Sequence, residues 1–406
     1  EQWQDTKVKA FYKGNQYFLF VTERYNDVRL VGAPPASIGK FGSDTDNWMF
    51  PRHTGDFAIF RIYADKNNRP AEYSKDNIPY TPKHHLPVSL DGVEEGDFTM
   101  VFGFPGRTNE YLPSVALEHI TMEFNPSNIA IREAALKSIN AKMKVDDEVR
   151  IKYASKQARI ANYWKKWIGE KQGIEKSNAI AHRKDLEKQF ASELKKQGLE
   201  AKYGYLLPEF DKLYNKYADT NIKRRNFIEL FIVNNELMHV MYRLYQMESA
   251  IKDDAGALDK NRSALLHRLK GIYKNYDVEV DKGVYNNIMP LYTSHVDASI
   301  YEKTNFTNFE DASKMLEGTS DEILKRINED AAYIYAKPFI EEFYTKINPE
   351  YNQMNLETSA VQKVYMKALM EVLPNQRYFP DANSTLRVTY GQVHGYSPKD
   401  AVYSFF

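Results

Sequence analysis

The residues best suited to chemistry lie close together in one stretch of the chain, residues 44–56. This stretch holds three aspartates, an amide, an indole and an imidazole, and it leads directly into an apolar run at residues 57–63. Polar groups at the entrance of a buried strand sit on a rigid scaffold, which catalysis and recognition both require. The stretch is therefore the first candidate for a functional site.

Asp56 is the candidate for acid–base chemistry. It opens the run 57–63, which is apolar on both faces over its first half, so we expect the carboxylate to be partly desolvated and to need a partner. One fitting partner is the Nδ1–H of a catalytic histidine, whose ring such an aspartate orients. The other interpretation is an aspartate that caps the turn after Thr54 and Gly55.

Asn47, Trp48 and Asn162 are candidates for recognition. A site for a free amino terminus needs acceptors for the ammonium hydrogens, such as amide oxygens, and an indole can form a wall beside them. Asn162 lies in the aromatic segment 161–167 and could project a further amide from a helix. The alternatives are a turn asparagine beside a core tryptophan, and a surface asparagine on a helix packed through its aromatic residues.

The histidines do not show the spacing of a metal site. His84 and His85 are adjacent, and neighbours on an extended chain point to opposite faces. No His-Glu-x-x-His motif occurs and the chain has no cysteine, so neither a zincin nor a thiolate zinc site is supported. We expect no metal, no cofactor and no metal-dependent hydrolysis.

Composition excludes two classes of partner. Lys plus Arg and Asp plus Glu are 55 each, so no net charge favours nucleic acid or an anionic membrane surface. No apolar run approaches the ~20 residues of a membrane-spanning helix. The 406 residues are enough for two or more domains.

Three segments must position the candidate residues, and together they predict an α+β fold. Residues 1–125 carry short β-branched and aromatic runs between Gly and Pro, typical of a barrel or sandwich. These runs lie at 8–12, 17–21, 28–31, 57–63, 88–90 and 98–102. Residues 126–375 have helical spacing, including one apolar stripe over 228–245. Residues 376–406 contain an alternating run, so a helical domain is predicted to be inserted into a β domain, with the returning strand joining the first sheet.

At these residues the chain resembles the bacterial serine dipeptidyl peptidases of the seven-and-eleven type. The longest matching motif is Asp46-Asn-Trp-Met-Phe-Pro-Arg-His-Thr-Gly-Asp-Phe57. Further matches lie at 27–42, 103–109, 161–169 and 381–393. The resemblance implies part of a chymotrypsin-like double β-barrel with a large inserted all-helical domain that caps the active site.

The resemblance also implies an activity and roles for single residues. Family members release dipeptides from the free amino terminus of peptides by Ser-His-Asp acyl transfer. Asp56 matches the triad aspartate, Asn47 and Trp48 match residues that bind the substrate's amino terminus, and Asn162 matches a helical-domain amide with the same role. The expected partner is an oligopeptide with a free amino terminus, and the resemblance suggests a homodimer in the periplasm or at the cell surface.

The chain departs from the family pattern in two places. The family's catalytic histidine lies upstream in the first barrel, and its serine lies in a Gly-Asn-Ser-Gly type segment downstream, and neither segment occurs here. We therefore expect a central fragment that is inactive by itself through the triad. The preference next to the cleaved bond, acidic or hydrophobic, stays open. The alternative function is a non-catalytic module whose helical domain binds a peptide or protein.

Overall fold

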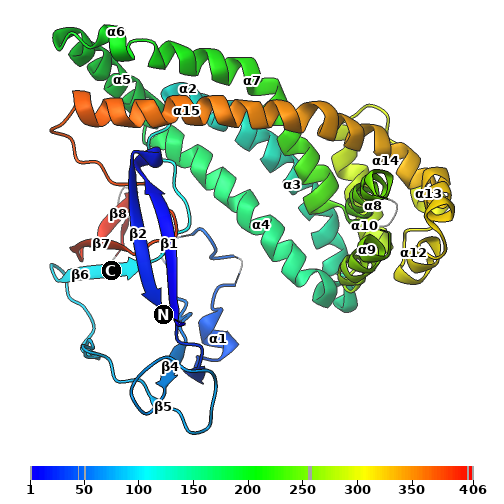
Figure 1. Ribbon diagram of the computed structural model, residues 1–406, viewed down its shortest axis with the longest axis horizontal. Coiled ribbons are helices and arrows are strands. Elements are labelled where there is room, and N and C mark those ends of the chain that lie inside the picture. Colours follow the sequence, from blue (N-terminus) through cyan, green and yellow to red (C-terminus); the bar gives the residue numbers. More distant parts are fainter. Residues whose placement is uncertain (1, 44, 50–51, 255–257, 400–401, 405–406) are drawn as a thin grey trace. The chain divides into compact units, whose positions relative to one another are not determined.

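The structure is a computed structural model that describes the chain except residues 1, 44, 50–51, 255–257, 400–401 and 405–406 (Figure 1). The chain forms two compact units. The strand-rich unit consists of Glu1–Phe41, His53–Leu112 and Gln362–Phe406, and the helical unit consists of Gly42–Arg52 and Pro113–Val361. The fold is thus mixed helix and strand. The domain boundaries expected at 125/126 and 375/376 stay a prediction.

The described strands of the strand-rich unit pair antiparallel in four small sheets. Their order is β1 (Gln4–Phe11) with β2 (Gln16–Glu23), β3 (Val28–Gly32) with β4 (Ile59–Ala64) and β5 (Ile78–Pro79), β6 (Phe98–Gly103) with β7 (Arg387–Gln392), and β8 (Tyr396–Lys399) with β9 (Val402–Ser404). A short helix, α1 (Ala36–Gly39), follows β3. In the β6–β7 ladder Phe98 lies opposite Gln392 and Gly103 opposite Arg387. The returning strand therefore joins a strand of the first segment, as the sequence pattern predicts.

Two of the predicted strands differ from the structure. Residues 88–90 form no strand, and the run 57–63 becomes a strand only at Ile59. That run is also exposed, since Phe57, Ile59 and Phe60 each keep more than half of their surface accessible. β4 pairs with β3 and β5 along its edges, and its residues 59–62 are all exposed. The expectation of a buried strand is wrong for this reason, and the described strands close no barrel.

An ion pair at the start of β3 is bonded by the loop that follows β4. Arg29 donates from Nε and Nη2 to the two oxygens of Asp27 at 2.9 and 2.8 Å, and Asn77 Nδ2 donates to Asp27 at 2.8 Å. The Arg29 guanidinium lies 3.7 Å from the centre of the Tyr63 ring. Arg29 holds the pKa of Asp27 at about 2, so the carboxylate stays charged although the residue is only 2% exposed.

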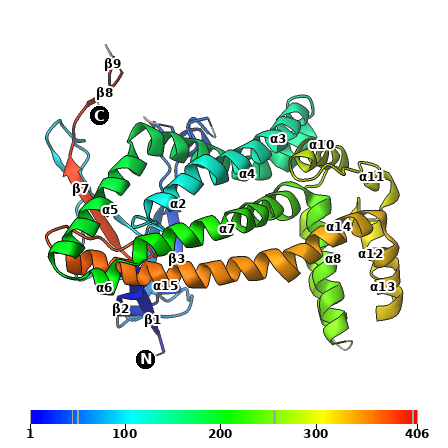
Figure 2. The ribbon, with the colours of Figure 1, turned by 90° about the horizontal axis from the view of Figure 1, so that it is seen from above.

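The helical unit is built from helices that follow one another with short connections. They are α2 (Ser114–His119), α3 (Asn125–Met143), α4 (Asp147–Lys176), α5 (Ala179–Lys196), α6 (Glu200–Tyr203), α7 (Leu206–Ile228), α8 (Glu236–Asp253), α9 (Leu258–Tyr273), α10 (Val278–Ile288), α11 (Ile300–Lys303), α12 (Phe309–Met315), α13 (Ser320–Glu329), α14 (Ala331–Glu342) and the first part of α15 (Asn348–Val372). The part of α15 from Gln362 onward belongs to the strand-rich unit. Helices α7 and α15 run alongside each other in both views (Figures 1 and 2). Thr220 on α7 donates to Glu350 on α15 at 2.7 Å.

The core of this unit is apolar and rich in stacked aromatic rings. Phe227 stacks on Phe231 at 4.6 Å and on Phe343 at 4.0 Å between ring centres. The apolar stripe predicted over 228–245 is not one helix, because a π-helical segment η3 (Glu229–Asn234) ends at Asn235. Asn235 has extended backbone and caps α8 by accepting a bond from Met238 N at 2.9 Å. An asparagine that bonds the backbone in this way favours a helix start over a helix interior.

Candidate functional site

Three of the predicted site residues meet at one atom of the helical unit. Asn162, on α4, accepts hydrogen bonds at Oδ1 from Asn47 Nδ2 at 2.8 Å and from Trp48 Nε1 at 2.9 Å. Asn162 lies more than one hundred positions from the other two in sequence. The structure therefore brings together the amide, the indole and the helical amide that the sequence analysis selected separately.

The indole determines how the two amides are oriented. An indole nitrogen can only donate, so the Asn162 atom that faces it must be the oxygen. Asn47 must then turn its NH₂ group toward Asn162, and its own Oδ1 accepts no hydrogen bond from any described residue. Asn47 is half-buried and Trp48 is 58% exposed. The site thus offers an available acceptor beside an open aromatic face.

The segment that carries Asn47 and Trp48 is fastened to α4 through its backbone. Lys165 Nζ donates to the carbonyls of Thr45 at 2.9 Å and Asn47 at 3.5 Å. Trp48 has φ of +62°, an uncommon conformation for a bulky residue. Gly42 has φ of +73°, and a Cβ there would lie 1.7 Å from the Asp46 carboxylate, so only glycine fits. The contacts of Gly42, Thr45 and Asn47 therefore define the conformation of the described residues around Trp48.

A buried ion pair supports the turn of α4 that precedes Asn162. Arg132 on α3 bonds Glu229 through Nε at 2.8 Å and Nη2 at 3.0 Å, and its Nη1 donates to the carbonyl of Ile160 at 3.0 Å. The guanidinium also lies 4.7 Å from the centre of the Trp167 ring. Arg132 and Glu229 are 4% and 6% exposed, so water does not compete for these bonds.

A cavity of about 530 Å³ borders this segment within the helical unit. Its lining comes from α3, α4 and the 42–52 segment and includes Thr45, Glu133, Lys137, Gln157, Trp164 and Lys165. Trp164 Nε1 is buried and has no partner among the described groups. Asn47, Trp48 and Asn162 are not among its lining residues, but Thr45 and Lys165, which form one of the contacts that hold the segment, line it.

Asp56 belongs to the strand-rich unit and is exposed. Around it, Gly55 N donates to Ile38 O at 3.1 Å, and Thr54 Oγ1 donates to the same carbonyl at 3.3 Å. The expectation that the carboxylate is partly desolvated is wrong for the described chain, because the neighbouring apolar residues are themselves exposed. The role of Asp56 as a histidine-orienting group stays a prediction.

Two further properties concern the described residues alone. They contain no group of three or more His, Asp or Glu side chains placed to hold a metal ion. None of their helices is both long and apolar enough to cross a membrane.

Lys165 lies three positions after Asn162, so helical spacing places both on one face. That spacing does not predict the bonds from Lys165 to the backbone of Thr45 and Asn47, and sequence reasoning missed the Arg132–Glu229 pair. Arg132 and Glu229 are 97 positions apart. No local pattern links such a pair, and only the packing of α3 against η3 reveals it.

Comparison with known proteins connects this geometry to a family. An Asp/Glu-specific dipeptidyl-peptidase of Flavobacterium psychrophilum is 48% identical over 421 residues, which cover 99% of this chain and 59% of that protein. Dipeptidyl-peptidase 7 of Porphyromonas gingivalis is 33% identical over 421 residues, covering 98% of this chain and 58% of that protein. The crystal structure of Porphyromonas endodontalis DPP11 matches with a TM-score of 0.83 and 29% identity, over 100% of this chain and 61% of that chain.

The chain thus spans about three fifths of the length of the relatives that it matches. Residues 1–406 match the Peptidase S46 family from end to end. The chain belongs to the Peptidase S46 family.

Proposed function

We propose that this chain is the part of a serine dipeptidyl peptidase that binds the free amino terminus of a peptide substrate. The observation that carries the proposal is the convergence of Asn47 and Trp48 on Asn162. The substrate ammonium group donates to Asn47 Oδ1 and lies against the exposed indole face, which attracts a cation. Holding the amino terminus at a fixed point selects the bond two residues further along.

In the whole protein, the bond is cleaved by acyl transfer. The serine oxygen attacks the carbonyl carbon, the histidine takes the serine proton and passes it to the leaving amine, and water then releases the dipeptide from the serine. Asp56 accepts the Nδ1–H of that histidine and stabilises its charged form. The strand-rich unit belongs to a chymotrypsin-like double β-barrel in this proposal, and the protein acts as a periplasmic or surface-associated homodimer on oligopeptides.

The comparisons support an acidic residue next to the cleaved bond. The relatives at 48% and 46% identity are both named Asp/Glu-specific dipeptidyl-peptidases, whereas two relatives named dipeptidyl-peptidase 7 are 35% and 33% identical. We therefore infer that the substrate carries Asp or Glu at its second position.

The test is the hydrolysis of a fluorogenic dipeptide with Glu at its second position by the whole protein, with a free or an acetylated amino terminus. Asn162→Ala removes the atom that orients Asn47 and Trp48. We expect kcat/KM for the free amine to fall about 10- to 100-fold, because Asn47 then no longer presents its oxygen to the ammonium group and that charge-assisted hydrogen bond is lost. Activity on the acetylated substrate should already be low and should change little. Gln172→Ala, which removes an exposed amide from the same helix, is the control.

Two outcomes would contradict the proposal. If Asn162→Ala reduced hydrolysis of the free and the acetylated substrate equally, the Asn162 amide would have no role in recognising the free amino terminus. If the whole protein bound peptides without releasing dipeptides, the non-catalytic binding module would be the correct function.

A further inference from the structure

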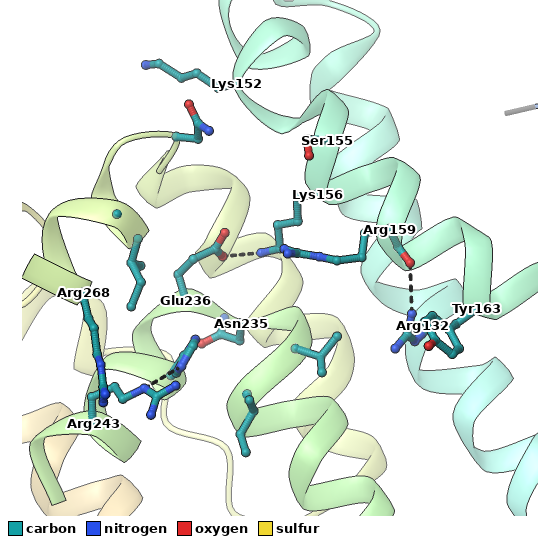
Figure 3. Close-up of a pocket in the computed structure, with 16 residues that line it drawn as sticks. Arg132, Lys152, Ser155, Lys156, Arg159, Tyr163, Asn235, Glu236, Arg243 and Arg268 are labelled. Carbon is teal, nitrogen blue, oxygen red and sulfur yellow. Dashed lines mark hydrogen bonds and ion pairs between the residues drawn. The ribbon is translucent and has the colours of Figure 1, made fainter. Parts of the chain in front are cut away.

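A second cavity in the helical unit has a cationic lining. Its volume is about 670 Å³, and it lies between α4, α8 and α9 (Figure 3). Its lining does not include Asn47, Trp48 or Asn162, although Arg132, which supports the α4 turn before Asn162, belongs to it. Six cationic side chains line it, against one carboxylate, that of Glu236: Arg132, Lys152, Lys156, Arg159, Arg243 and Arg268.

Three of the six cations are neutralised by carboxylates. Arg132 pairs with Glu229, Lys152 with Glu148, and Lys156 with Glu236. The only carboxylate of the lining is therefore already engaged. Burial raises the pKa of the Glu236 carboxyl, but the nearby Lys156 outweighs burial and holds that pKa below its usual range. Glu236 and Lys156 therefore remain a charged pair.

The other three cations have no acidic partner among the described residues: Arg159, Arg243 and Arg268. Arg243 donates to neutral groups, His239 Nε2 at 3.0 Å and Gln246 Oε1 at 2.9 Å. Burial is the main cause that lowers the pKa of His239 to about 4, and the positive charge of the nearby Arg243 is the second. The imidazole is therefore neutral at physiological pH, and the excess charge of the cavity comes from the three arginines.

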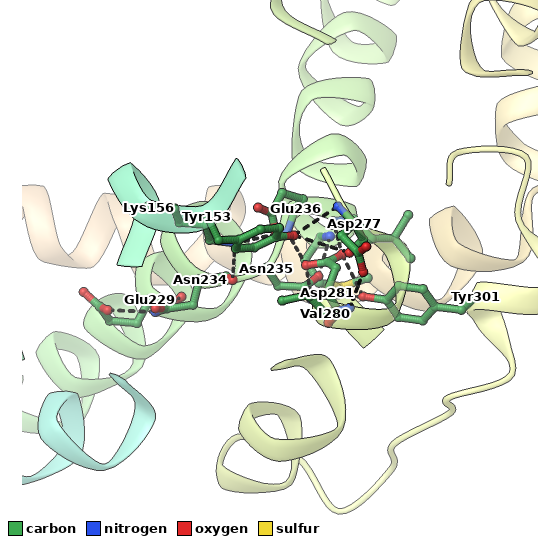
Figure 4. A network of polar contacts seen from close by, with 12 residues as sticks. Tyr153, Lys156, Glu229, Asn234, Asn235, Glu236, Asp277, Val280, Asp281 and Tyr301 are labelled. Carbon is green, nitrogen blue, oxygen red and sulfur yellow. Dashed lines mark hydrogen bonds and ion pairs between the residues drawn. The ribbon is translucent and has the colours of Figure 1, made fainter. Parts of the chain in front are cut away.

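The helix that carries Arg243 has a fixed start. Asp281 is fully buried and accepts the first two backbone N–H groups of α8, from Glu236 at 2.8 Å and Leu237 at 2.9 Å. Asn235 and Tyr301 donate to the same carboxylate (Figure 4). Since these bonds are sheltered from water, the α8 wall of the cavity is rigid. His239 and Arg243 lie one and two helical turns after Glu236, the first residue of α8.

Three guanidinium groups around one cavity repel one another unless an anion lies between them. A guanidinium matches the geometry of phosphate and carboxylate oxygens through paired N–H donors. We propose that this cavity binds a small oxyanion with two or more negative charges, held by Arg159, Arg243 and Arg268. Tetrahedral phosphate and a tricarboxylate share this chemistry. The proposal does not rest on the peptidase function, because no residue of the amino-terminus site contributes to it.

The experiment measures binding of two probes, inorganic phosphate and citrate, to the whole protein at pH 7.5. Calorimetry and thermal unfolding are both recorded, with sodium chloride added to keep the ionic strength constant, because salt alone screens the arginines. We expect at least one probe to bind and to raise the unfolding temperature. Binding of phosphate alone indicates a tetrahedral ligand, and binding of citrate alone indicates a carboxylate ligand.

Arg243→Gln and Arg268→Gln should each weaken that binding about tenfold or more, as each removes charge-assisted bonds. Arg268 is exposed, so its replacement leaves the core intact, and an unchanged unfolding temperature without ligand verifies this. The matched control is Arg150→Gln on α4, an exposed arginine outside the cavity that pairs with Asp147. If neither probe bound above the salt control, or if both cavity variants bound as tightly as the parent protein, the proposal would be overturned.

Discussion

Replacing Trp48 by phenylalanine isolates the contribution of one hydrogen bond to the proposed recognition of the amino terminus. The change keeps an aromatic face, although a smaller one, and removes the donor that lies 2.9 Å from Asn162 Oδ1. The loss of ring area is matched by the control variant Trp164→Phe. A neutral hydrogen bond of this kind contributes about 0.5–1.5 kcal/mol, and Trp48 is exposed enough that water replaces part of it. Without the indole, the Asn162 amide can also turn its NH₂ group toward Asn47.

These magnitudes correspond to a 2- to 10-fold decrease in kcat/KM for a dipeptide substrate with a free amino terminus. The decrease should appear in KM, because the lost contact holds the substrate equally in the ground state and in the transition state. The assay is steady-state hydrolysis by the whole protein. The control is Trp164→Phe. Trp164 lies on α4, and its indole N–H has no hydrogen-bond partner among the described groups.

Two results would refute this reasoning. A fall in kcat at unchanged KM would place Trp48 in the chemical step. A Trp48→Phe variant as active as the parent protein would show that the orientation of the Asn162 amide does not matter for binding.

Three further expectations concern other residues. Arg132→Met should lower the free energy of unfolding of the helical unit by about 3–5 kcal/mol in denaturant, because it leaves Glu229 buried and unpaired. Adding Glu229→Leu should recover part of this loss. An effect of Arg132→Met below about 1 kcal/mol would contradict the account of this pair. Asp56→Asn should lower kcat of the whole protein by about four orders of magnitude with an unchanged circular dichroism spectrum, and an unaltered kcat would remove Asp56 from the triad. The charge on Asp27 stabilises the fold at neutral pH, and this contribution should be lost as pH falls from about 4 through its folded pKa of about 2. Asp27→Asn should therefore unfold at a lower temperature than the parent protein at pH 6 but not at pH 2, and a difference independent of pH would argue against an ionised Asp27.

The general architecture followed from sequence patterns that act over short distances. Alternating runs predicted β1, β2, β3, β6 and β7 to within a few residues, and helical spacing predicted the helical segment. β5 was missed because its two residues, Ile78 and Pro79, are too short to show alternation. The run 57–63 was predicted to be buried from its apolar composition. Burial depends on what covers a strand, however, and composition does not contain that information.

For the candidate site, too, one part was predictable from the sequence and another part was not. The residue types at Asn47, Trp48 and Asn162 indicated recognition, and the family resemblance selected those three from many similar residues. Their convergence on one oxygen depends on how the 42–52 segment packs against α4. Likewise, the cationic cavity is lined by residues of α3, α4, α8 and α9. In the sequence, each of these arginines by itself has the features of an ordinary surface residue. Properties that depend on several distant segments were therefore invisible before the fold was known.

The β6–β7 ladder has a consequence for the order in which the protein folds. Gly103 lies opposite Arg387, so this pair closes a loop that comprises residues 104–386. If that loop were a flexible chain, its closure would cost on the order of 5 kcal/mol of entropy, more than the six residue pairs of a two-stranded ladder readily supply. A compact helical unit shortens the effective path between the two strands. We therefore expect the helices to form first and this sheet to assemble in a later and slower kinetic phase.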